Sequence, residues 1–233
     1  MQLAIFDLDA LLAGQTCDAL WSRFLHSLGE ADDAKVERCE RMIQQYHAGT
    51  VVPEDYALAQ AALLSARTRA SLQPLREHFL ALHIRPRISV AVRQLLQQHA
   101  DEGDTLLLTS VSCREIAEPI AALLGVDTML CTRLVWFEGR CTGLLHGHPN
   151  MRMHKLARVH HWLREHGQSE ATLRRASFYS SSINDLALLS AVGRPRVIDP
   201  GPRLAATAMH KGWHRVLLHR SPLRERPLDE TPA

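Results

Sequence analysis

The chain has 233 residues, of which 46% are hydrophobic, so it can form one large domain or a core with an inserted subdomain, and wholesale disorder is excluded. Its 27 basic and 25 acidic side chains give a net charge of +2, which argues against a nucleic-acid-binding or membrane-surface protein. The five cysteines form no CxxC pair, the N-terminus lacks a signal-peptide pattern, and no apolar run is long enough to span a membrane. We therefore expect a cytoplasmic protein.

The first predicted element is a short strand over residues 3–9. It begins as an apolar run, which is typical of a buried strand, and ends in Asp7 and Asp9. Residues i and i+2 of a strand point to the same side. We therefore expect both carboxylates to face one pocket at the carboxyl end of the strand, where open α/β sheets bind ligands.

Four helical patterns follow with no strand between them. Apolar residues at helical spacing predict helices over residues 18–28, 36–46, 53–64 and 67–83. Helices that are not separated by strands cannot be the crossover helices of a parallel sheet. We therefore expect residues 17–84 to form a helical cap domain inserted after the first strand.

From residue 89 the pattern alternates between helices and strands. Strands are predicted over residues 105–109, 129–132, 177–179, 196–198 and 216–218, and a hairpin over residues 134–142. The strand at 105–109 is expected to end at Ser110, and Ser112 with Glu115 has the form of a capping box at the start of the next helix. Pro119 inside that helix removes a hydrogen bond that the local sequence does not replace.

The alternation predicts an α/β fold with a Rossmann-like parallel sheet flanked by helices, built from residues 1–16 and 85–220. The charged tail over residues 221–233 contains three prolines and is expected to be disordered.

Polar residues occur at four predicted strand ends or helix starts. They are Asp7 with Asp9, then Ser110, then Lys155, and finally Asn184 with Asp185. Each has an ordinary structural explanation when taken alone, such as a helix cap or a solvated lysine. Together they suit phosphoryl transfer, in which a carboxylate attacks phosphorus, a second acid moves protons, and a hydroxyl and a lysine hold the phosphoryl oxygens.

The chain resembles phosphatases of the haloacid dehalogenase superfamily, in particular the phosphoserine phosphatase-like members of subfamily IB, which carry a helical cap after the first motif. The segments that carry the resemblance are residues 6–9, 110–121, 155, 179–189, 199–204 and 212–213. The resemblance implies Asp7 as nucleophile and Asp9 as general acid and base, with Ser110 and Lys155 as phosphate ligands. It also implies a Mg²⁺ ion held by Asp7, the backbone carbonyl of Asp9, and Asp185.

Two positions depart from the family pattern. Leu11 stands where the family usually carries threonine, and Ser181 replaces an aspartate that is normally a direct magnesium ligand. Because magnesium prefers anionic oxygen ligands, the second change predicts weaker metal binding and slower turnover. The expected function is a magnesium-dependent phosphatase that hydrolyses a small phosphomonoester through an aspartyl-phosphate. The alternative is a weakened or inactive protein of the same fold that binds a phosphorylated ligand or partner.

The sequence does not select the substrate or the oligomeric state. The expected partner is a small phosphorylated metabolite, with phosphoserine and histidinol phosphate as substrates suggested by the resemblance. Asn150 and Arg152 lie just before Lys155 and are candidates for further phosphate or substrate contacts, although ordinary loop positions explain them better.

Overall fold

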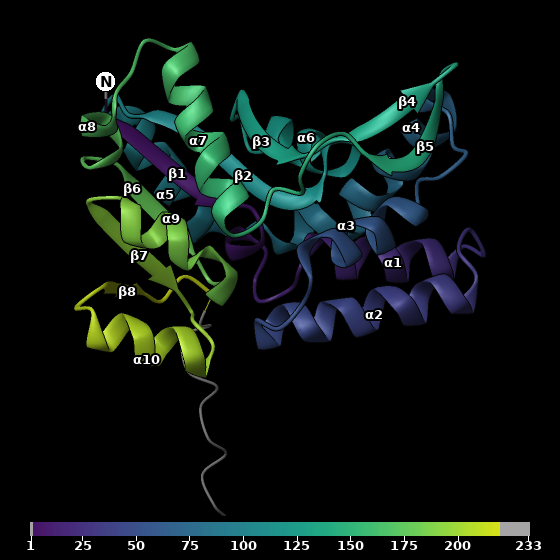
Figure 1. Cartoon of the computed structure of the whole chain (residues 1–233), viewed down its shortest axis with the longest axis horizontal. Helices are drawn as coiled ribbons and strands as arrows, with labels where there is room; N and C mark the ends of the chain where they lie inside the picture. Colours follow the sequence, from purple (N-terminus) through teal and green to yellow (C-terminus); the bar gives the residue numbers. More distant parts are fainter. Residues whose placement is uncertain (1, 220–233) are drawn as a thin grey trace, which may run out of the picture.

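A computed structural model describes residues 2–219, and in this part of the chain six strands form a parallel sheet (Figure 1). The strands are β1 (Leu3–Asp7), β2 (Thr105–Cys113), β3 (Thr128–Thr132), β6 (Ser177–Ser180), β7 (Arg194–Ile198) and β8 (His214–Val216). Their order is β3-β2-β1-β6-β7-β8, which is that of a doubly wound sheet with β1 at the point where the order reverses. The predicted Rossmann-like α/β fold is confirmed.

Helices cover both faces of this sheet because its strands are apolar on both sides. In β1, Ala4 and Phe6 belong to the core cluster that includes residues of α5 (Val90–Asp101) and α6 (Arg114–Leu123). Leu3 and Ile5 face the other way, into a cluster with α7 (Met153–Glu165), α9 (Leu186–Ala191) and α10 (Pro202–His210). A one-turn helix, α8 (Glu170–Leu173), precedes β6 and was not predicted. Every residue of β1 is buried, so the chain is built around this strand.

The segment between β1 and α5 is helical, as predicted. It contains α1 (Cys17–Ser27), α2 (Asp33–Ala48), α3 (Pro53–Ala62) and α4 (Arg69–Phe79), followed by a π-helical turn η2 (Leu80–Ile84) and a 3₁₀ turn η3 (Arg85–Arg87). Figure 1 shows α1 to α4 gathered at one end of the molecule, away from β6, β7 and β8.

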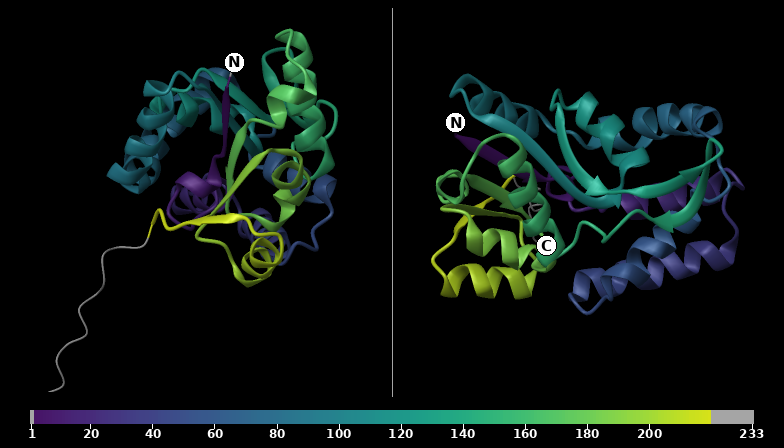
Figure 2. Two further views of the ribbon diagram at one scale, coloured as in Figure 1. Left: turned by 90° about the vertical axis from the view of Figure 1, so that its left-hand side faces the viewer. Right: turned by 45° about the horizontal axis from the view of Figure 1, so that its top comes forward.

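A hairpin from the second half of the chain joins these helices. Its strands are β4 (Leu134–Phe137) and β5 (Arg140–Leu145), and they form a two-stranded sheet of their own. Cys141 exchanges backbone hydrogen bonds with the turn before α4, donating to Arg67 and accepting from Ala66 at 2.9 and 2.8 Å. The right-hand view in Figure 2 shows the hairpin extending away from the main sheet toward the helices.

The predicted end of the second strand is wrong. β2 continues past Ser110 to Cys113, which pairs with Thr132 of β3. The Thr132 hydroxyl also donates to the carbonyl of Val111. These contacts hold residues 110–113 in extended form, so α6 begins at Arg114 and Ser112 is not its cap. Pairing with β3 therefore outweighs the local capping-box signal.

The placement of Asp9 in the first strand is also wrong. The strand ends at Asp7, and Leu8 has helical backbone angles, so Asp9 opens a short 3₁₀ helix, η1 (Asp9–Leu11). The side-to-side alternation of a strand therefore does not position its carboxylate. The expected disorder of residues 221–233 lies outside the described residues. Among residues 2–219, no helix has both the length and the apolar character needed to cross a membrane.

Pro119 has a compensating partner that the local sequence does not reveal. A residue at its position would normally donate its N–H to the carbonyl of Glu115, one turn earlier in α6. Arg76 of α4 donates its guanidinium to that carbonyl instead, at 3.4 Å. The hydrogen bond lost inside α6 is thus replaced by one that ties α6 to the helical segment.

Candidate active site

Two carboxylates converge on one buried lysine at the carboxyl edge of the sheet. Lys155 Nζ lies 2.8 Å from Asp7 Oδ1 and 2.7 Å from Asp185 Oδ1. All three side chains are at most 2% exposed. The structure therefore brings together three of the predicted site residues, which are far apart in the sequence.

Each of these three residues follows from the fold around it. Asp7 is the last residue of β1, and β1 lies between β2 and β6, where the strand order reverses. Lys155 lies in the first turn of α7. Asp185 follows β6 in the 3₁₀ turn η4 (Ile183–Asp185), and Ser180 Oγ donates to its second carboxylate oxygen at 2.7 Å. The serine thereby orients Asp185 toward the lysine.

The electrostatics of this group are governed by burial. Burial raises the pKa of Asp7, the Lys155 ammonium lowers it and Asp185 raises it, so that the pKa is about 6. Burial alone would lower the pKa of Lys155, but Asp185 and Asp7 raise it above its ordinary value. The lysine therefore stays charged. Asp7 Oδ2 makes no hydrogen bond among the described residues. This carboxylate oxygen is thus available as a nucleophile or a metal ligand.

Asp9 is held by the start of a helix. Its Oδ1 accepts the N–H of Cys17, the first residue of α1, at 2.8 Å. Burial raises the pKa of Asp9 well above the ordinary value, as do the nearby carboxylates of Asp7 and Asp18, and the bond from Cys17 offsets only part of this. A carboxyl group with a raised pKa can be protonated near neutral pH, which a general acid requires.

Ser110 lies at the same edge, in β2, one residue beyond the position paired with Asp7. Its hydroxyl oxygen accepts the N–H of Ser112 at 3.1 Å, which leaves its hydroxyl hydrogen free to donate. Asn150, considered above as a ligand contact, is fully buried and instead forms hydrogen bonds within the sheet edge. Its side-chain amide donates to Thr109 Oγ1 and to the carbonyls of Ser110 and Leu130, each at 2.8 Å.

The donor set fits a magnesium ion. Asp7 and Asp185 each supply a carboxylate, and Asp7 Oδ2 is buried without a hydrogen-bond partner among the described residues. Magnesium favours such hard oxygen ligands and usually retains several waters. Ser181, at the position of the missing family carboxylate, is partly exposed and lines a cavity with Asp9.

That cavity has a volume of about 430 Å³, within the range of small-molecule sites. It opens between the last turn of α2 and the loops that follow β6 and β7, and its wall includes Asp9, Tyr46, His47, Ser181 and Arg203. A small metabolite would therefore meet residues of the inserted helices as well as those at the sheet edge.

Asn184 points away from the carboxylates. Its amide Nδ2 donates to the carbonyl of Tyr46 in α2 at 2.7 Å, and its Oδ1 accepts from Arg152 Nε at 3.3 Å. Arg152 also donates to the carbonyl of Gly49 at 3.0 Å. These two residues bind the end of α2 to the sheet edge.

Asp18 is a buried carboxylate that the sequence pattern did not single out. It lies in the first turn of α1, is 3% exposed, and accepts the Tyr56 hydroxyl at 2.8 Å. Burial raises its pKa to about 6, against the opposing hydrogen bond from Tyr56. The apolar stripe of α1 gave no signal for it, because an acid in a first helical turn is ordinary.

Comparisons with known proteins agree with this fold. The family described as haloacid dehalogenase-like hydrolase matches residues 4–190. A protein named histidinol-phosphatase from Neisseria meningitidis is 33% identical over 213 residues, which are 91% of this chain and 96% of that protein.

Two solved structures are also similar. A protein of unknown function from Bordetella pertussis has a TM-score of 0.85 at 33% identity, covering 93% of this chain and 98% of that one. A phosphoserine phosphatase described as a phospho-aspartyl intermediate analogue has a TM-score of 0.65 at 16% identity, covering 88% and 90%. The second likeness shows a shared fold. On the family match and the 33% identity with a named phosphatase, the chain belongs to the haloacid dehalogenase-like hydrolases.

Proposed function

We propose that this protein is a magnesium-dependent phosphatase that hydrolyses a small phosphomonoester through an aspartyl-phosphate at Asp7. The observation that carries the proposal is the buried Asp7 carboxylate, which keeps one oxygen unpartnered while Lys155 Nζ holds the other at 2.8 Å. The second support is the raised pKa of Asp9, which allows this residue to carry a proton.

The residues divide the reaction as follows. Asp7 Oδ2 attacks phosphorus, and the bond from phosphorus to the ester oxygen breaks as Asp9 donates its proton to the leaving alcohol. Asp9 then takes a proton from water, whose oxygen attacks the acyl phosphate, and inorganic phosphate leaves with Asp7 restored. Lys155 and the Ser110 hydroxyl hold phosphoryl oxygens throughout. Magnesium, when held by Asp7, Asp185 and the carbonyl of Asp9, would offset phosphoryl charge.

We further propose that residues 17–84 act as a cap over a core of residues 1–16 and 85–220. The support is the position of Tyr46 and His47, at the end of α2, in the wall of the cavity that also contains Asp9. A phosphomonoester that occupied this cavity would be enclosed by α2, which favours exclusion of water from the acyl phosphate.

Histidinol phosphate is the first substrate to test, because the Neisseria relative is named for it. Phosphoserine serves as the comparison substrate.

The test is steady-state hydrolysis of both compounds and of p-nitrophenyl phosphate, with and without Mg²⁺. We expect hydrolysis that requires Mg²⁺ and that falls by at least about 10³-fold in Asp7→Asn, because the variant lacks the nucleophile. Hydrolysis that survives this substitution would refute the aspartyl-phosphate route.

The second candidate function is ligand binding with little or no turnover, and Ser181 favours it. Ser181→Asp restores a carboxylate at the cavity wall where Ser181 stands. If the protein is a weakened enzyme, this change raises both magnesium affinity and turnover strongly. Little change would favour a site that already works with Asp7 and Asp185.

A further inference from the structure

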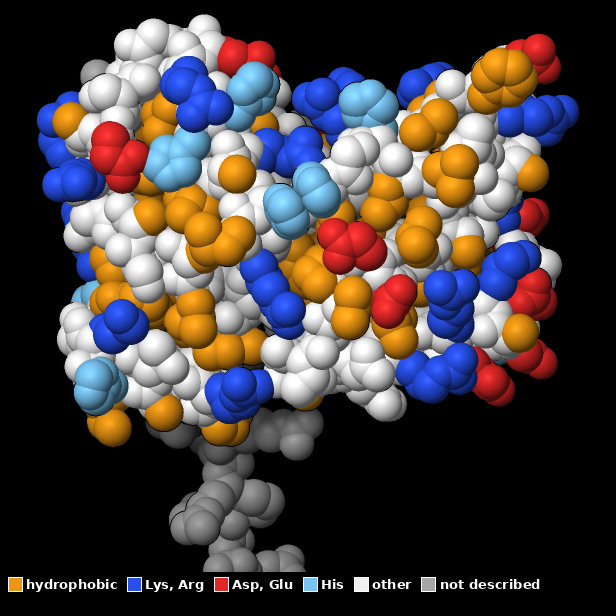
Figure 3. Space-filling model, in the orientation of Figure 1, with side chains coloured by type: hydrophobic (Ala, Val, Ile, Leu, Met, Phe, Trp, Pro, Cys, Tyr) orange, Lys and Arg blue, Asp and Glu red, His pale blue; other side chains and the backbone are white. Residues whose placement is uncertain are grey.

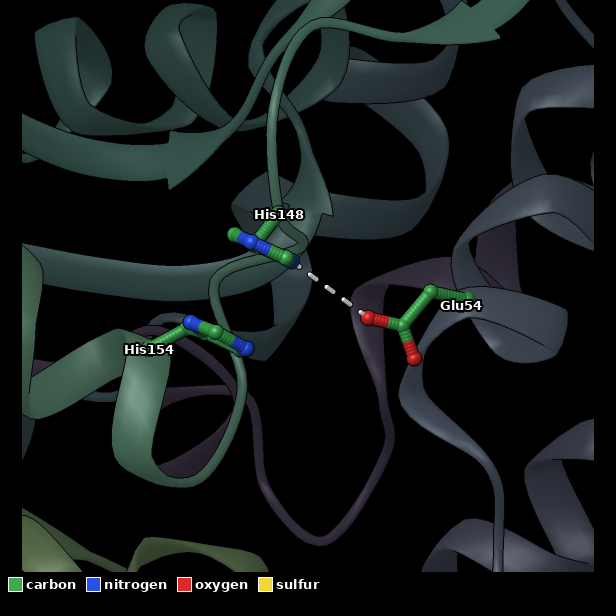
Figure 4. Close-up of side chains that lie close together, drawn as sticks. All are labelled: Glu54, His148 and His154. Carbon is green, nitrogen blue, oxygen red and sulfur yellow. Dashed lines mark ion pairs between the residues drawn. The ribbon is translucent and has the colours of Figure 1, made fainter.

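Three side chains with metal-ligating atoms meet outside the site described above. Glu54 lies in the first turn of α3, His148 in the loop between β5 and α7, and His154 in the first turn of α7. One ligand atom from each lies within 4.8 Å of the others. Figure 4 shows the two imidazole rings lying one above the other, with the Glu54 carboxylate beside them.

We propose that Glu54, His148 and His154 bind a divalent transition-metal ion, with Zn²⁺ as the best match, and that this ion ties α3 to the first turn of α7. Two imidazoles and one carboxylate, with water in the remaining position, form a common zinc ligand set. Imidazole nitrogen distinguishes this site from the all-oxygen set proposed for magnesium at Asp7 and Asp185.

The geometry requires the side chains to rotate, because a metal ion lies in the plane of each imidazole that binds it and the two rings are stacked within 4° of parallel. Zinc lies about 2.0–2.2 Å from its nitrogen and oxygen ligands, so two ligands of one ion can be about 4 Å apart at most. The atoms here lie within 4.8 Å, and His148 Nδ1 is 3.7 Å from Glu54 Oε1. The side chains of His148 and Glu54 are 69% and 47% exposed, so they can rotate to close this gap.

The two imidazole rings lie together, and their nitrogens have no hydrogen-bond partner among the described residues. The His148 and His154 rings stack 4.0 Å apart and are within 4° of parallel. Within residues 2–219, no hydrogen bond engages the ring nitrogens of either residue. Arg158 donates to the carbonyl of His148 at 2.9 Å, which fixes the backbone of the loop beside α7. The loop is therefore held while the ring stays available.

A second cluster, of one histidine and two carboxylates, shows the contrast with a histidine whose ring nitrogens are already hydrogen-bonded. His99 lies near Glu102 and Asp104, but its Nδ1 is 2.6 Å from Asp104 Oδ2 and its Nε2 is 2.9 Å from the Tyr179 hydroxyl. Both ring nitrogens are already used in a buried network. The cluster at Glu54 has no such competing bonds, and this difference selects it as the metal site.

The experiment is a Zn²⁺ titration of the untagged full chain against a chromophoric chelator, in excess Mg²⁺. Magnesium prefers oxygen ligands and should leave the histidine site open to zinc. We expect one site that weakens at least about tenfold in each of Glu54→Gln, His148→Asn and His154→Asn. The matched control is His161→Asn, which removes a histidine 3.2 Å from Glu165 on the exposed face of α7 and should change nothing.

Zinc could also bind at the catalytic carboxylates, and Asp185→Asn separates the two sites. The proposal requires that this variant keep the zinc site, whatever happens to hydrolysis. It also requires that zinc raise the thermal midpoint of the wild type more than that of His154→Asn. Equal zinc binding by the wild type and the three ligand variants, or an equal loss in His161→Asn, would overturn it.

Discussion

Replacing Lys155 with methionine isolates the charge at the centre of the site. Methionine has nearly the same length and volume but no charge, so the packing of the first turn of α7 is preserved. The substitution leaves Asp7 and Asp185, each buried, without the ammonium group that lies 2.8 and 2.7 Å from them. In buffer without divalent ions nothing replaces that charge.

Two estimates bound the unfolding free energy that Lys155→Met should lose. Each contact is worth about 6 kcal/mol in gross Coulomb energy at an effective dielectric constant of ~20, most of which the burial of the charges offsets. Breaking a buried pair typically costs about 3–5 kcal/mol. The variant can limit this cost by protonating Asp7. At pH 8, about two units above the Asp7 pKa of about 6, that proton costs at most about 3 kcal/mol.

The sign of the pH dependence follows from the same values. Asp7 has a folded pKa of about 6 and an ordinary value of 3.8, so the folded protein binds this proton more tightly than the unfolded chain. Near pH 5 Asp7 is largely protonated in both proteins. We therefore expect Lys155→Met to lose about 3 kcal/mol of unfolding free energy at pH 8, and clearly less at pH 5.

The assay is urea unfolding followed by the fluorescence of the four tryptophans, in EDTA, at both pH values. Lys35→Met is the matched control, because it breaks an ion pair with Asp32 at 2.8 Å that solvent screens, so the loss of stability should be small. The reasoning fails if Lys155→Met costs no more than this control, or if its cost is the same at pH 5 and pH 8.

Two further predictions concern other buried groups. Burial raises the pKa of Asp18 to about 6 from 3.8, so its contribution to stability is full below about pH 4 and is lost as pH rises through 6, by about 3 kcal/mol in total. Asp18→Asn keeps an acceptor for the Tyr56 hydroxyl and should flatten the urea-measured stability between pH 4 and pH 7; an unchanged slope would contradict this. Arg76→Met leaves the Glu115 carbonyl without its donor and should cost about 1 kcal/mol, but less in a Pro119→Ala background, where the intrahelical bond can form; equal costs in both backgrounds would contradict this.

The sequence predicts the sheet and its helices well because their apolar periodicity is a local property. β1 reads as buried and is buried throughout, and the helices α1 to α4 begin and end close to their predicted limits. The errors occur where partners distant in the sequence decide the backbone. The end of β2 is the main case, because Cys113 pairs with Thr132.

Part of the candidate site could also be predicted from the sequence. Asp7, Lys155 and Asp185 come together because parallel strands present their carboxyl ends at one edge, which is a rule of topology. Asp18 and Asn150 had no such signal. Their roles depend on burial, and burial comes from contacts with Tyr56 in one case and with Thr109 of β2 and Leu130 of β3 in the other.

The end of α2 shows how long-range contacts complete a local signal. Gly49 ends the helix with a left-handed conformation, φ 71°, as a glycine after an apolar stripe predicts. The carbonyls at its end, however, accept hydrogen bonds from residues distant in the sequence, namely Asn184, Arg152 and Arg203, the last of which donates to Ala48.

On the face shown in Figure 3, basic and acidic side chains are interspersed, without a large patch of one sign.

These bonds couple the end of α2 to the edge of the sheet where Asp7, Lys155 and Asp185 meet. Asn184 is adjacent to Asp185, and Arg152 lies one turn before Lys155. Arg152 has φ 53° and ψ −126°, a strained backbone for a residue other than glycine, and its guanidinium bonds to Gly49 and Asn184 help to hold it there. The end of α2 therefore cannot leave the sheet edge without breaking hydrogen bonds made by the neighbours of Asp185 and Lys155. Access to the cavity and the alignment of the buried charges thus depend on the same few contacts.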